Sequence, residues 1–554
     1  STIVAQLEPV GAPVAPIWLE PLPRAVSLDR AAGGFDITED GLRLRAKSDG
    51  GLPVPVGLLD DPAHQWQGTW TLDLAESGGN LMILGGPGTG KTTALRTLAL
   101  GLASTHRPTD VGVYAIDLLG NGLRGLAELP HVGGVAGRDD FERVRRTIDE
   151  LHGMLADREK LFQRKQIDDI AQLRGEPGEL PCTEVVLLLD GYGQLAAAFE
   201  SIEPRVHDLL ARGGRYGIHV VATARRWNEV RGAQQVGFGN RIELKLTDSA
   251  ESSIEGKLAR TIADNGRALT ADKLFGQLAL PRLDSVADPA GSGLAEAAAL
   301  VRSTWTGPVP PPIRVLPAVL DPAELPQSDG SPQSRGVPLG RFEQDFEPAV
   351  LDLFGRDQHL LVLGDSATGK TNLLKLVTGE LVRRYPADEI TFAVFDPRHG
   401  LGDLVPDEHL GGYATNHALA NQLAQAVCQE LVKRGDPEHP AGPRIVLVVD
   451  DYDVLAASGS QPLAPFVPHL AAGRDLGLHV VLTRRVMGAA RGLFEPFTMG
   501  VRESGCLSLL MSGDRSEGQL FPGVRPTTLP PGRAQLIRPG DPMRMVQSAY
   551  LGDT

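Results

Sequence analysis

The sequence has 554 residues, 42% of them apolar and 22% charged, and 69 acidic residues against 54 basic ones give a formal charge of −15. These values indicate a globular protein of about two to four domains and disfavour non-specific binding to nucleic acid or anionic lipid. Three scattered cysteines exclude a disulfide framework, and no apolar run reaches the roughly 18 residues that a membrane span needs, so we expect a cytosolic chain.

The first predicted domain covers residues 51–305 and contains a phosphate-binding loop. Residues 1–50 carry several prolines and little periodicity, which predicts an extended arm ahead of this domain. The motif G-x-x-x-x-G-K-[ST] follows the apolar run 81–84 and precedes a helical pattern, which is the setting that a P-loop requires. Its candidate ligands are Gly85, Gly86, Pro87, Gly88, Thr89, Gly90, Lys91, Thr92 and Thr93.

Further along this domain, three short apolar runs end in polar residues. The run 113–117 ends at Asp117, the run 185–190 ends at Asp190, and the run 217–223 ends at Thr223. Between the first two, residues 141–167 have apolar side chains at helical spacing, which predicts a long surface helix. Arg225 and Arg226 follow the third run.

A second domain is predicted over residues 336–554, after a Pro-rich stretch at 306–335 that predicts a semi-rigid linker. Its apolar run 445–450 ends at Asp450 and is followed by Asp451, and its run 477–483 is followed by Arg484 and Arg485. The second P-loop motif, with the next residue, consists of Gly364, Asp365, Ser366, Ala367, Thr368, Gly369, Lys370, Thr371 and Asn372.

The two domains are copies of one unit, because their landmarks recur at constant offsets. Gly364 lies 279 positions after Gly85, as Asp396 does after Asp117, whereas Asp450 lies 260 positions after Asp190. The fall from 279 to 260 places 19 extra residues in the first copy, in the interval that holds the predicted helix. Continuous apolar runs alternate with helical patterns, so we predict an α/β fold of two tandem P-loop NTPase domains with mainly parallel sheets.

The motif pattern predicts ATP and Mg²⁺ as cofactors. Backbone N–H groups of a P-loop surround the phosphates at the N-terminus of a helix, where the helix dipole also favours anions. Lys91 and Lys370 would reach the β- and γ-phosphates. Thr92 with Asp190, and Thr371 with Asp450, would hold Mg²⁺, partly through water.

Hydrolysis also requires a group that orients and deprotonates a water molecule. The residue after the magnesium-site aspartate is Gly191 in the first copy, so we expect that site to turn over slowly. Asp451 stands at this position in the second copy and is a candidate catalytic base, with a helix cap as the alternative. Arg225 and Arg485 are candidate arginine fingers, with surface ion pairs as the alternative.

The tandem P-loops, the segments DLLGNGL at 117–123 and LPHVGGV at 129–135, and the two G-[IL]-H-V-V-x-T strands resemble the FtsK/SpoIIIE ATPases. Within them, the chain resembles the EccC-type ATPases of type VII (ESX) secretion over nearly its whole length. Such proteins have a membrane anchor followed by three tandem RecA/FtsK-like ATPase domains. The resemblance therefore implies the last two domains, as a C-terminal part or as a split soluble subunit.

The resemblance also implies partners. It points to capture of Esx (WXG100) substrates in a pocket of the second domain and to self-association. It also implies that the chain is cytoplasmic, peripheral to the plasma membrane, and works there with other secretion components. Two other functions stay open: a nucleotide-bound adaptor without catalysis, and a DNA translocase. The acidic charge and the early end of the chain after the landmark 532–534 disfavour the translocase, so we expect no nucleic acid as partner.

Overall fold

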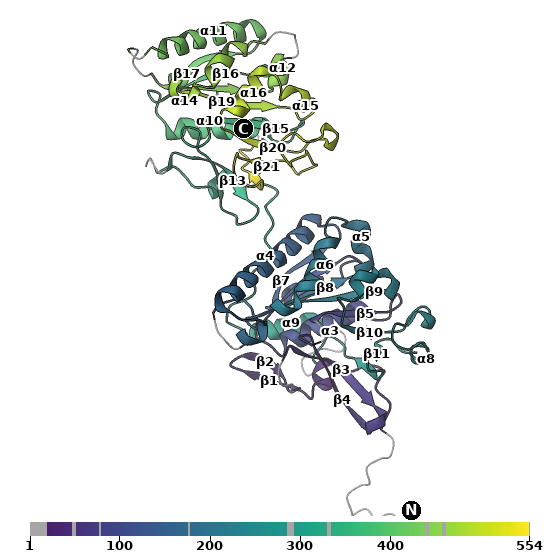
Figure 1. Cartoon of the computed structure of the whole chain (residues 1–554). Coiled ribbons are helices and arrows are strands. Elements are labelled where there is room, and N and C mark those ends of the chain that lie inside the picture. The colour runs from purple at the N-terminus through teal and green to yellow at the C-terminus, as the bar shows by residue number, and fades with distance from the viewer. Residues whose placement is uncertain are drawn as a thin grey trace, which may run out of the picture. The chain divides into compact units, whose positions relative to one another are not determined.

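The computed structural model describes residues 19–46, 51–76, 79–174, 178–284, 293–329, 334–436, 438, 442–456 and 461–552. Residues 1–18 and 47–50 of the predicted arm and 330–333 of the predicted linker lie outside this part of the chain. The chain divides into two compact units, Ser1–Val315 and Leu316–Thr554, each built on its own sheet (Figure 1).

The described residues of the first unit form a 10-stranded mixed sheet in the order β4-β3-β12-β11-β10-β5-β9-β8-β6-β7. The six strands from β10 to β7 are parallel, and the other four are antiparallel. Their bounds are β3 (Pro53–Asp61), β4 (Trp66–Asp73), β5 (Leu81–Leu84), β6 (Val111–Asp117), β7 (Val132–Gly137), β8 (Glu184–Asp190), β9 (Ile218–Ala224), β10 (Asn240–Glu243), β11 (Arg267–Thr270) and β12 (Phe275–Leu278).

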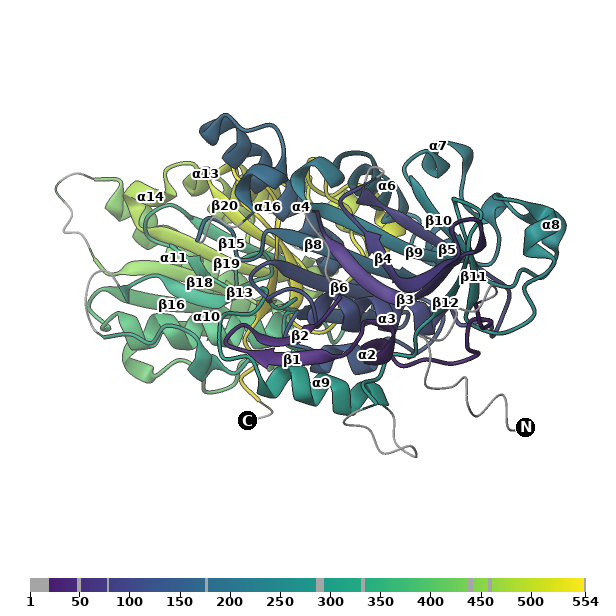
Figure 2. The same ribbon diagram turned by 90° about the horizontal axis from the view of Figure 1, so that it is seen from below.

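Helices cover both faces of this sheet, which explains why its central strands are apolar throughout. Side chains on one face of β5, such as Ile83, pack with α3 and α9, whereas Met82 packs on the opposite face with α4 and α6. Figure 2 shows α9 on the same face of the sheet as α3, and the two helices are in contact. The helices are α2 (Leu28–Ala31), α3 (Lys91–Ala103), α4 (Phe141–Lys165), α5 (Leu195–Ala198), α6 (Glu203–Arg212), α7 (Gly232–Gln235), α8 (Gly256–Ala259) and α9 (Gly293–Ser303).

The second unit repeats the topology, with a 10-stranded sheet among its described residues in the order β14-β13-β22-β21-β20-β15-β19-β18-β16-β17. Its strands are β13 (Val337–Phe342), β14 (Pro348–Leu351), β15 (His359–Leu363), β16 (Ile390–Phe395), β17 (Leu410–Ala414), β18 (Arg444–Val449), β19 (Leu478–Arg484), β20 (Cys506–Leu510), β21 (Arg533–Ile537) and β22 (Arg544–Ser548). Its helices are α10 (Lys370–Arg384), α11 (His417–Arg434), α12 (Tyr452–Ala456), α13 (Val467–Leu470), α14 (Gly473–Leu476), α15 (Ala489–Gly492) and α16 (Pro496–Glu503). The predicted α/β class with mainly parallel sheets is confirmed.

The segments that precede each sheet are more structured than an extended chain. The described part of the predicted arm contains α2 and a hairpin of β1 (Phe35–Thr38) with β2 (Gly41–Leu44). In the predicted linker, Ile313 donates its backbone N–H to Gly133 of the first unit, and Leu320 bridges to Ala549 of the second. The Pro-rich stretch is therefore divided between the two units.

The extra residues of the first copy lengthen a helix that both copies have. α4 begins at Phe141 and follows β7, and α11 follows β17 at the same point of the second unit. α4 has 25 residues and α11 has 18, and the first unit also has a longer connection to its next strand. Among the described residues, no helix combines the length and apolar character that crossing a membrane requires.

Candidate nucleotide-binding sites

Each P-loop lies at the carboxyl end of the central parallel strand, where ligands of open α/β sheets usually bind. β5 leads into the first loop and β15 into the second, and α3 and α10 begin at the motif lysines. β5 is hydrogen-bonded to β9, and β9 to β8, so Thr223 and Asp190 end strands beside the loop. The same arrangement holds for β15, β19 and β18.

The first loop uses glycine where its backbone conformation demands it. Gly88 and Gly90 have φ of 73° and 108°, in the left-handed region that a Cβ disfavours. A Cβ on Gly85 would lie 2.6 Å from the Thr89 hydroxyl. That hydroxyl donates to the carbonyl of Gly86 at 2.9 Å and closes the turn.

The predicted magnesium ligands of the first unit are in direct contact. The Thr92 hydroxyl donates to Asp190 Oδ2 at 2.6 Å, and the Thr223 hydroxyl donates to Asp190 Oδ1 at 2.5 Å. Thr223 also accepts the backbone N–H of Gly191 at 2.9 Å. The Oδ2 atom of the carboxylate is thereby held at the start of α3, and Oδ1 at the end of β9.

The second unit repeats these contacts. Thr371 and Thr483 donate to Asp450 at 2.9 and 2.5 Å, and the Asp451 N–H donates to the Thr483 hydroxyl at 2.8 Å. Its loop has Ala367 at φ 60°, at the position that Gly88 takes in the first loop. A hydroxyl beside a carboxylate supplies the hard oxygen ligands that Mg²⁺ prefers, so the residues present fit this ion at both sites.

Burial shapes the charges at these sites. It raises the pKa of both Asp190 and Asp450, and the hydrogen bonds from the two threonines act in the opposite direction. Burial also lowers the pKa of the Lys91 ammonium, which the nearby Asp190 opposes. A bound polyanion would favour the charged form of Lys91 and so raise the pKa of its ammonium again.

The P-loop lysines differ in their partners. Lys91 donates to the carbonyls of Gly85 and Gly86, at 2.7 Å each. Lys370 donates to the Asp365 carbonyl at 3.0 Å, and its Nζ lies 3.9 Å from Asp451 Oδ1. The structure thus brings the candidate base Asp451 to the second P-loop.

The candidate arginine fingers lie at the strand ends where the sequence places them. Arg225 is exposed, its charge acts on Lys91 of its own unit, and its backbone N–H donates to Glu229. Arg485 forms an ion pair with Asp453, with 3.5 Å between Nε and Oδ2. A role for either in a neighbouring subunit stays a prediction.

The residues after the two motifs contribute in different ways. The Asn372 side chain is bound on both sides by the C-terminal segment, through the carbonyl of Ala549 and the N–H of Leu551. Thr93 is half-buried in the first turn of α3. Pro87 and Ser366 are exposed on the loops.

Sequence reasoning missed two features that the fold brings to the P-loops. Gly266 and Gly532 donate their N–H groups to Thr89 and Thr368 at 3.2 and 2.9 Å, so the turn before β11 or β21 supports each loop. The recurrence of G-R-A at both places was the available signal. The second feature is Arg398, whose Nε lies 2.8 Å from Asp451 Oδ2.

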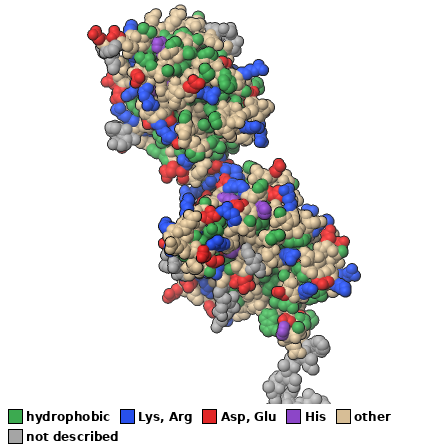
Figure 3. Space-filling model, in the orientation of Figure 1, with side chains coloured by type: hydrophobic (Ala, Val, Ile, Leu, Met, Phe, Trp, Pro, Cys, Tyr) green, Lys and Arg blue, Asp and Glu red, His purple; other side chains and the backbone are tan. Residues whose placement is uncertain are grey.

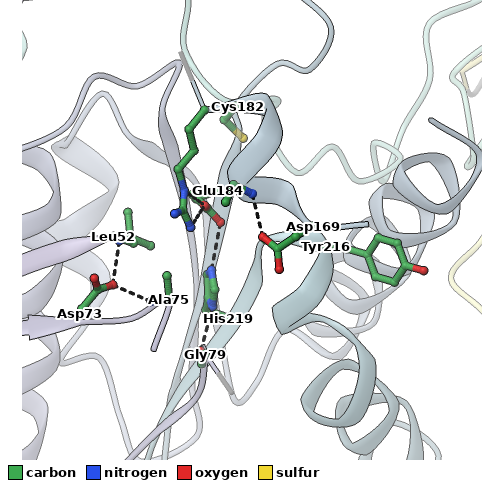
Figure 4. Close-up of polar contacts among 12 residues, drawn as sticks. Leu52, Asp73, Ala75, Gly79, Asp169, Cys182, Glu184, Tyr216 and His219 are labelled. Atoms are coloured by element: carbon green, nitrogen blue, oxygen red, sulfur yellow. Dashed lines mark hydrogen bonds and ion pairs between the residues drawn. The ribbon is translucent and has the colours of Figure 1, made fainter. Parts of the chain in front are cut away.

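The strand histidines lie inside the fold, away from solvent. Figure 4 shows His219 between the carbonyl of Gly79 and the Glu184 carboxylate, which are 2.9 and 3.0 Å from its two ring nitrogens. Its counterpart His479 donates from Nδ1 to the carbonyl of Gln358, 3.0 Å away. Both are buried structural residues.

Comparison with known proteins finds the same architecture. A model of the FtsK/SpoIIIE family matches residues 58–285. The ESX secretion system protein EccC of Thermomonospora curvata is 37% identical and covers 99% of this chain, with 43% of its own length matched. The ESX-1 secretion system protein EccCb1 of Mycolicibacterium smegmatis is 34% identical, over 90% of this chain and 89% of its own.

A solved structure of Thermomonospora curvata EccC, comprising ATPases 2 and 3 in complex with a signal sequence peptide, has a TM-score of 0.77 to this chain at 35% identity. The match covers 97% of this chain and 100% of the chain in that structure. The chain spans less than half the length of the first curated relatives that it matches. These matches confirm the resemblance found in the motifs. The chain belongs to the FtsK/SpoIIIE family and, within it, to the EccC ATPases of ESX type VII secretion, whose ATPase 2 and 3 region it matches.

Proposed function

We propose that this chain binds ATP with Mg²⁺ at both P-loops and captures the signal peptides of secreted substrates on its second unit. The paired hydroxyl and carboxylate at Thr92–Asp190 and Thr371–Asp450 support the metal at each site. When bound, the ion would neutralise charge on the nucleotide phosphates. We further propose that the chain works with other secretion components at the cytoplasmic face of the plasma membrane and self-associates there.

The observation that carries substrate capture is a groove that the first unit fills with its own chain. There, Ile313 donates its N–H to the Gly133 carbonyl at 2.8 Å, and the Tyr114 hydroxyl donates to the Pro311 carbonyl at 2.9 Å. A Cβ on Gly134 would lie 2.9 Å from the Ile313 side chain. The segment therefore packs closely along β6 and β7.

The second unit has an open pocket at the equivalent place. Ala393 pairs with Gly412 as Tyr114 pairs with Gly134, so Gly411 takes the position of Gly133. The pocket holds about 330 Å³ beside α11, and Ala393 leaves room that the Tyr114 ring fills in the first unit. Its lining is mainly apolar: Thr391, Phe392, Ala393, Gly411, Leu423, Ala426, Val427, Glu430, Arg434, Pro443 and Ile445.

We infer that a substrate peptide lies in this groove as residues 311–313 lie in the first unit. An apolar side chain of the peptide would enter the pocket, and its backbone would pair with Gly411. The EccC relative in complex with a signal sequence peptide supports a peptide as the occupant. On the face shown in Figure 3, basic and acidic side chains are interspersed, which favours a protein substrate over nucleic acid.

Ala426→Trp tests the groove, because Ala426 is exposed and lines the pocket. We expect this variant to bind a fluorescent Esx C-terminal peptide at least about tenfold more weakly, a loss of about 1.4 kcal/mol. Gln425→Trp is the matched control, since Gln425 is the exposed neighbour on α11 outside the lining. Equal peptide affinities of the two variants, measured by fluorescence anisotropy, would contradict the proposed site.

A further inference from the structure

Asp451 of the second unit lies between two cations. Its Oδ2 is 2.8 Å from the Nε of Arg398, and its Oδ1 is 3.9 Å from the Nζ of Lys370. The Asp451 side chain is 13% exposed, whereas that of Arg398 is 51% exposed. The guanidinium therefore covers the carboxylate from the solvent side, and the P-loop lysine faces it from within.

The backbone also holds this carboxylate in place. Asp451 has φ 45°, in the left-handed region, which aspartate tolerates better than most residues. Its N–H is fixed by the Thr483 hydroxyl and by Asp450 Oδ1, at 2.8 and 3.1 Å. The side chain is thus directed at the P-loop, and its position depends on what pairs with its oxygens.

The positions equivalent to Arg398 and Asp451 in the first unit are both occupied by different residues. Leu119 lies 279 positions before Arg398, and Gly191 lies 260 positions before Asp451. A Cβ on Gly191 would lie 2.7 Å from the Leu119 side chain, so these two positions touch as well. One copy has an apolar contact here and the other an ion pair, which indicates that Arg398 serves Asp451.

We propose that Arg398 is a positioning residue that restrains Asp451 and keeps ATP hydrolysis at the second site slow. The inference rests on the ATP binding proposed above. In hydrolysis, a water oxygen bonds to the γ-phosphorus, the bond from that phosphorus to the bridging oxygen of ADP breaks, and a base takes the water proton. A general base must reach the attacking water with the correct geometry. The ion pair of Arg398 with Oδ2 holds the Asp451 carboxylate in one orientation, and this restraint slows hydrolysis at the second site.

Arg398→Leu tests this directly, because leucine is the residue that the first unit has at this position. Lys91→Ala in the parent removes the contribution of the first site. We expect Arg398→Leu in this parent to raise the steady-state rate of ATP hydrolysis by about tenfold or more, within the range of general-base effects. The gain appears in kcat, whereas the affinity for ATP stays unchanged.

Two further variants separate positioning from a structural effect. Adding Asp451→Asn to Arg398→Leu should remove the whole gain, since the freed carboxylate is its source. Arg356→Leu is the matched control, because Arg356 is an exposed arginine of the same unit that pairs with Asp541 at 2.8 Å. It should leave the rate unchanged, and all variants should melt at the temperature of the parent.

The outcomes distinguish this inference from the proposed function. A rate that is unchanged or lower in Arg398→Leu, with ATP still bound, overturns the role of Arg398. A gain that persists in Arg398→Leu/Asp451→Asn also overturns it, because the base is then another group. Failure of the Lys91→Ala parent to bind ATP overturns the proposed nucleotide site instead.

Discussion

At the residue scale, the two candidate nucleotide sites share their hydrogen bonds and differ in the residue that follows the predicted magnesium ligand Asp190 or Asp450. Thr92 and Thr371 make the same contact to their aspartates. The following position has positive φ in both units, 93° at Gly191 and 45° at Asp451. A backbone in this region favours glycine, so the first unit has the residue that costs least and gives up any carboxylate there.

The lysines provide the residue-scale prediction. Lys91→Ala and Lys370→Ala should each remove roughly half of the nucleotide bound per chain, because each deletes the ammonium that reaches the phosphates of one site only. The measurement is the ATP released on denaturation, quantified by chromatography. Lys160→Ala, an exposed lysine of α4, is the control and should retain all of it. Loss of nucleotide from both sites in one variant would argue against independent sites.

At the element scale, the extended end of α4 builds a small core of its own. Leu161 and Phe162 pack with Ile170 and Leu173, and the Phe162 ring lies 4.8 Å from that of Tyr216. The helical spacing of apolar residues predicted this helix from the sequence, and α4 ends within two residues of the predicted end. The partner of its last turn could not be predicted, because Tyr216 is some fifty residues away and belongs to no periodic pattern.

Phe162→Ala tests that satellite core. Deleting a ring that is 4% exposed should cost about 3 kcal/mol in the local stability of the first unit, through lost burial and a cavity. Phe141→Ala on the same helix is the matched control, since Phe141 is 49% exposed and should cost less. Hydrogen exchange of peptides from 141–216 reports the difference. Equal effects of the two substitutions would show that the extension contributes little.

At the scale of the whole molecule, each unit buries neutral histidines. Burial lowers the pKa of His131 in the first unit to about 4, and those of His359 and His479 in the second to about 3 and about 4. An unfolded chain would bind protons at these residues from about pH 6.5 downward, whereas the folded chain does not. Both units are therefore expected to lose stability in acid.

The expected loss has a defined range. The free energy of unfolding should fall as the pH decreases from about 6.5 to about 4, with a slope approaching 1.4 kcal/mol per pH unit for each such histidine. His359→Asn keeps an acceptor for the Val480 N–H, which the ring accepts at 3.1 Å, and does not titrate. Urea unfolding at several pH values should show a shallower slope for this variant. A slope equal to that of the unaltered chain would contradict the assignment.

The sequence by itself determined the duplicated P-loops, the α/β class and the family. These features are written in consecutive residues: a glycine-rich nest after a buried strand, apolar runs that need cover on both faces, and landmarks at fixed offsets. The predicted magnesium partners Thr92 and Asp190 also followed, because the carboxyl ends of neighbouring parallel strands meet at one edge of a sheet.

Only the tertiary structure decided what surrounds these residues. Arg398 meets Asp451 because the loop after β16 and the end of β18 converge at the P-loop, although 53 positions separate the two residues in the chain. The groove beside α11 is open because Ala393 stands where Tyr114 fills the first unit. Such contacts depend on side chains that only folding brings together, so no local pattern of residues could have announced them.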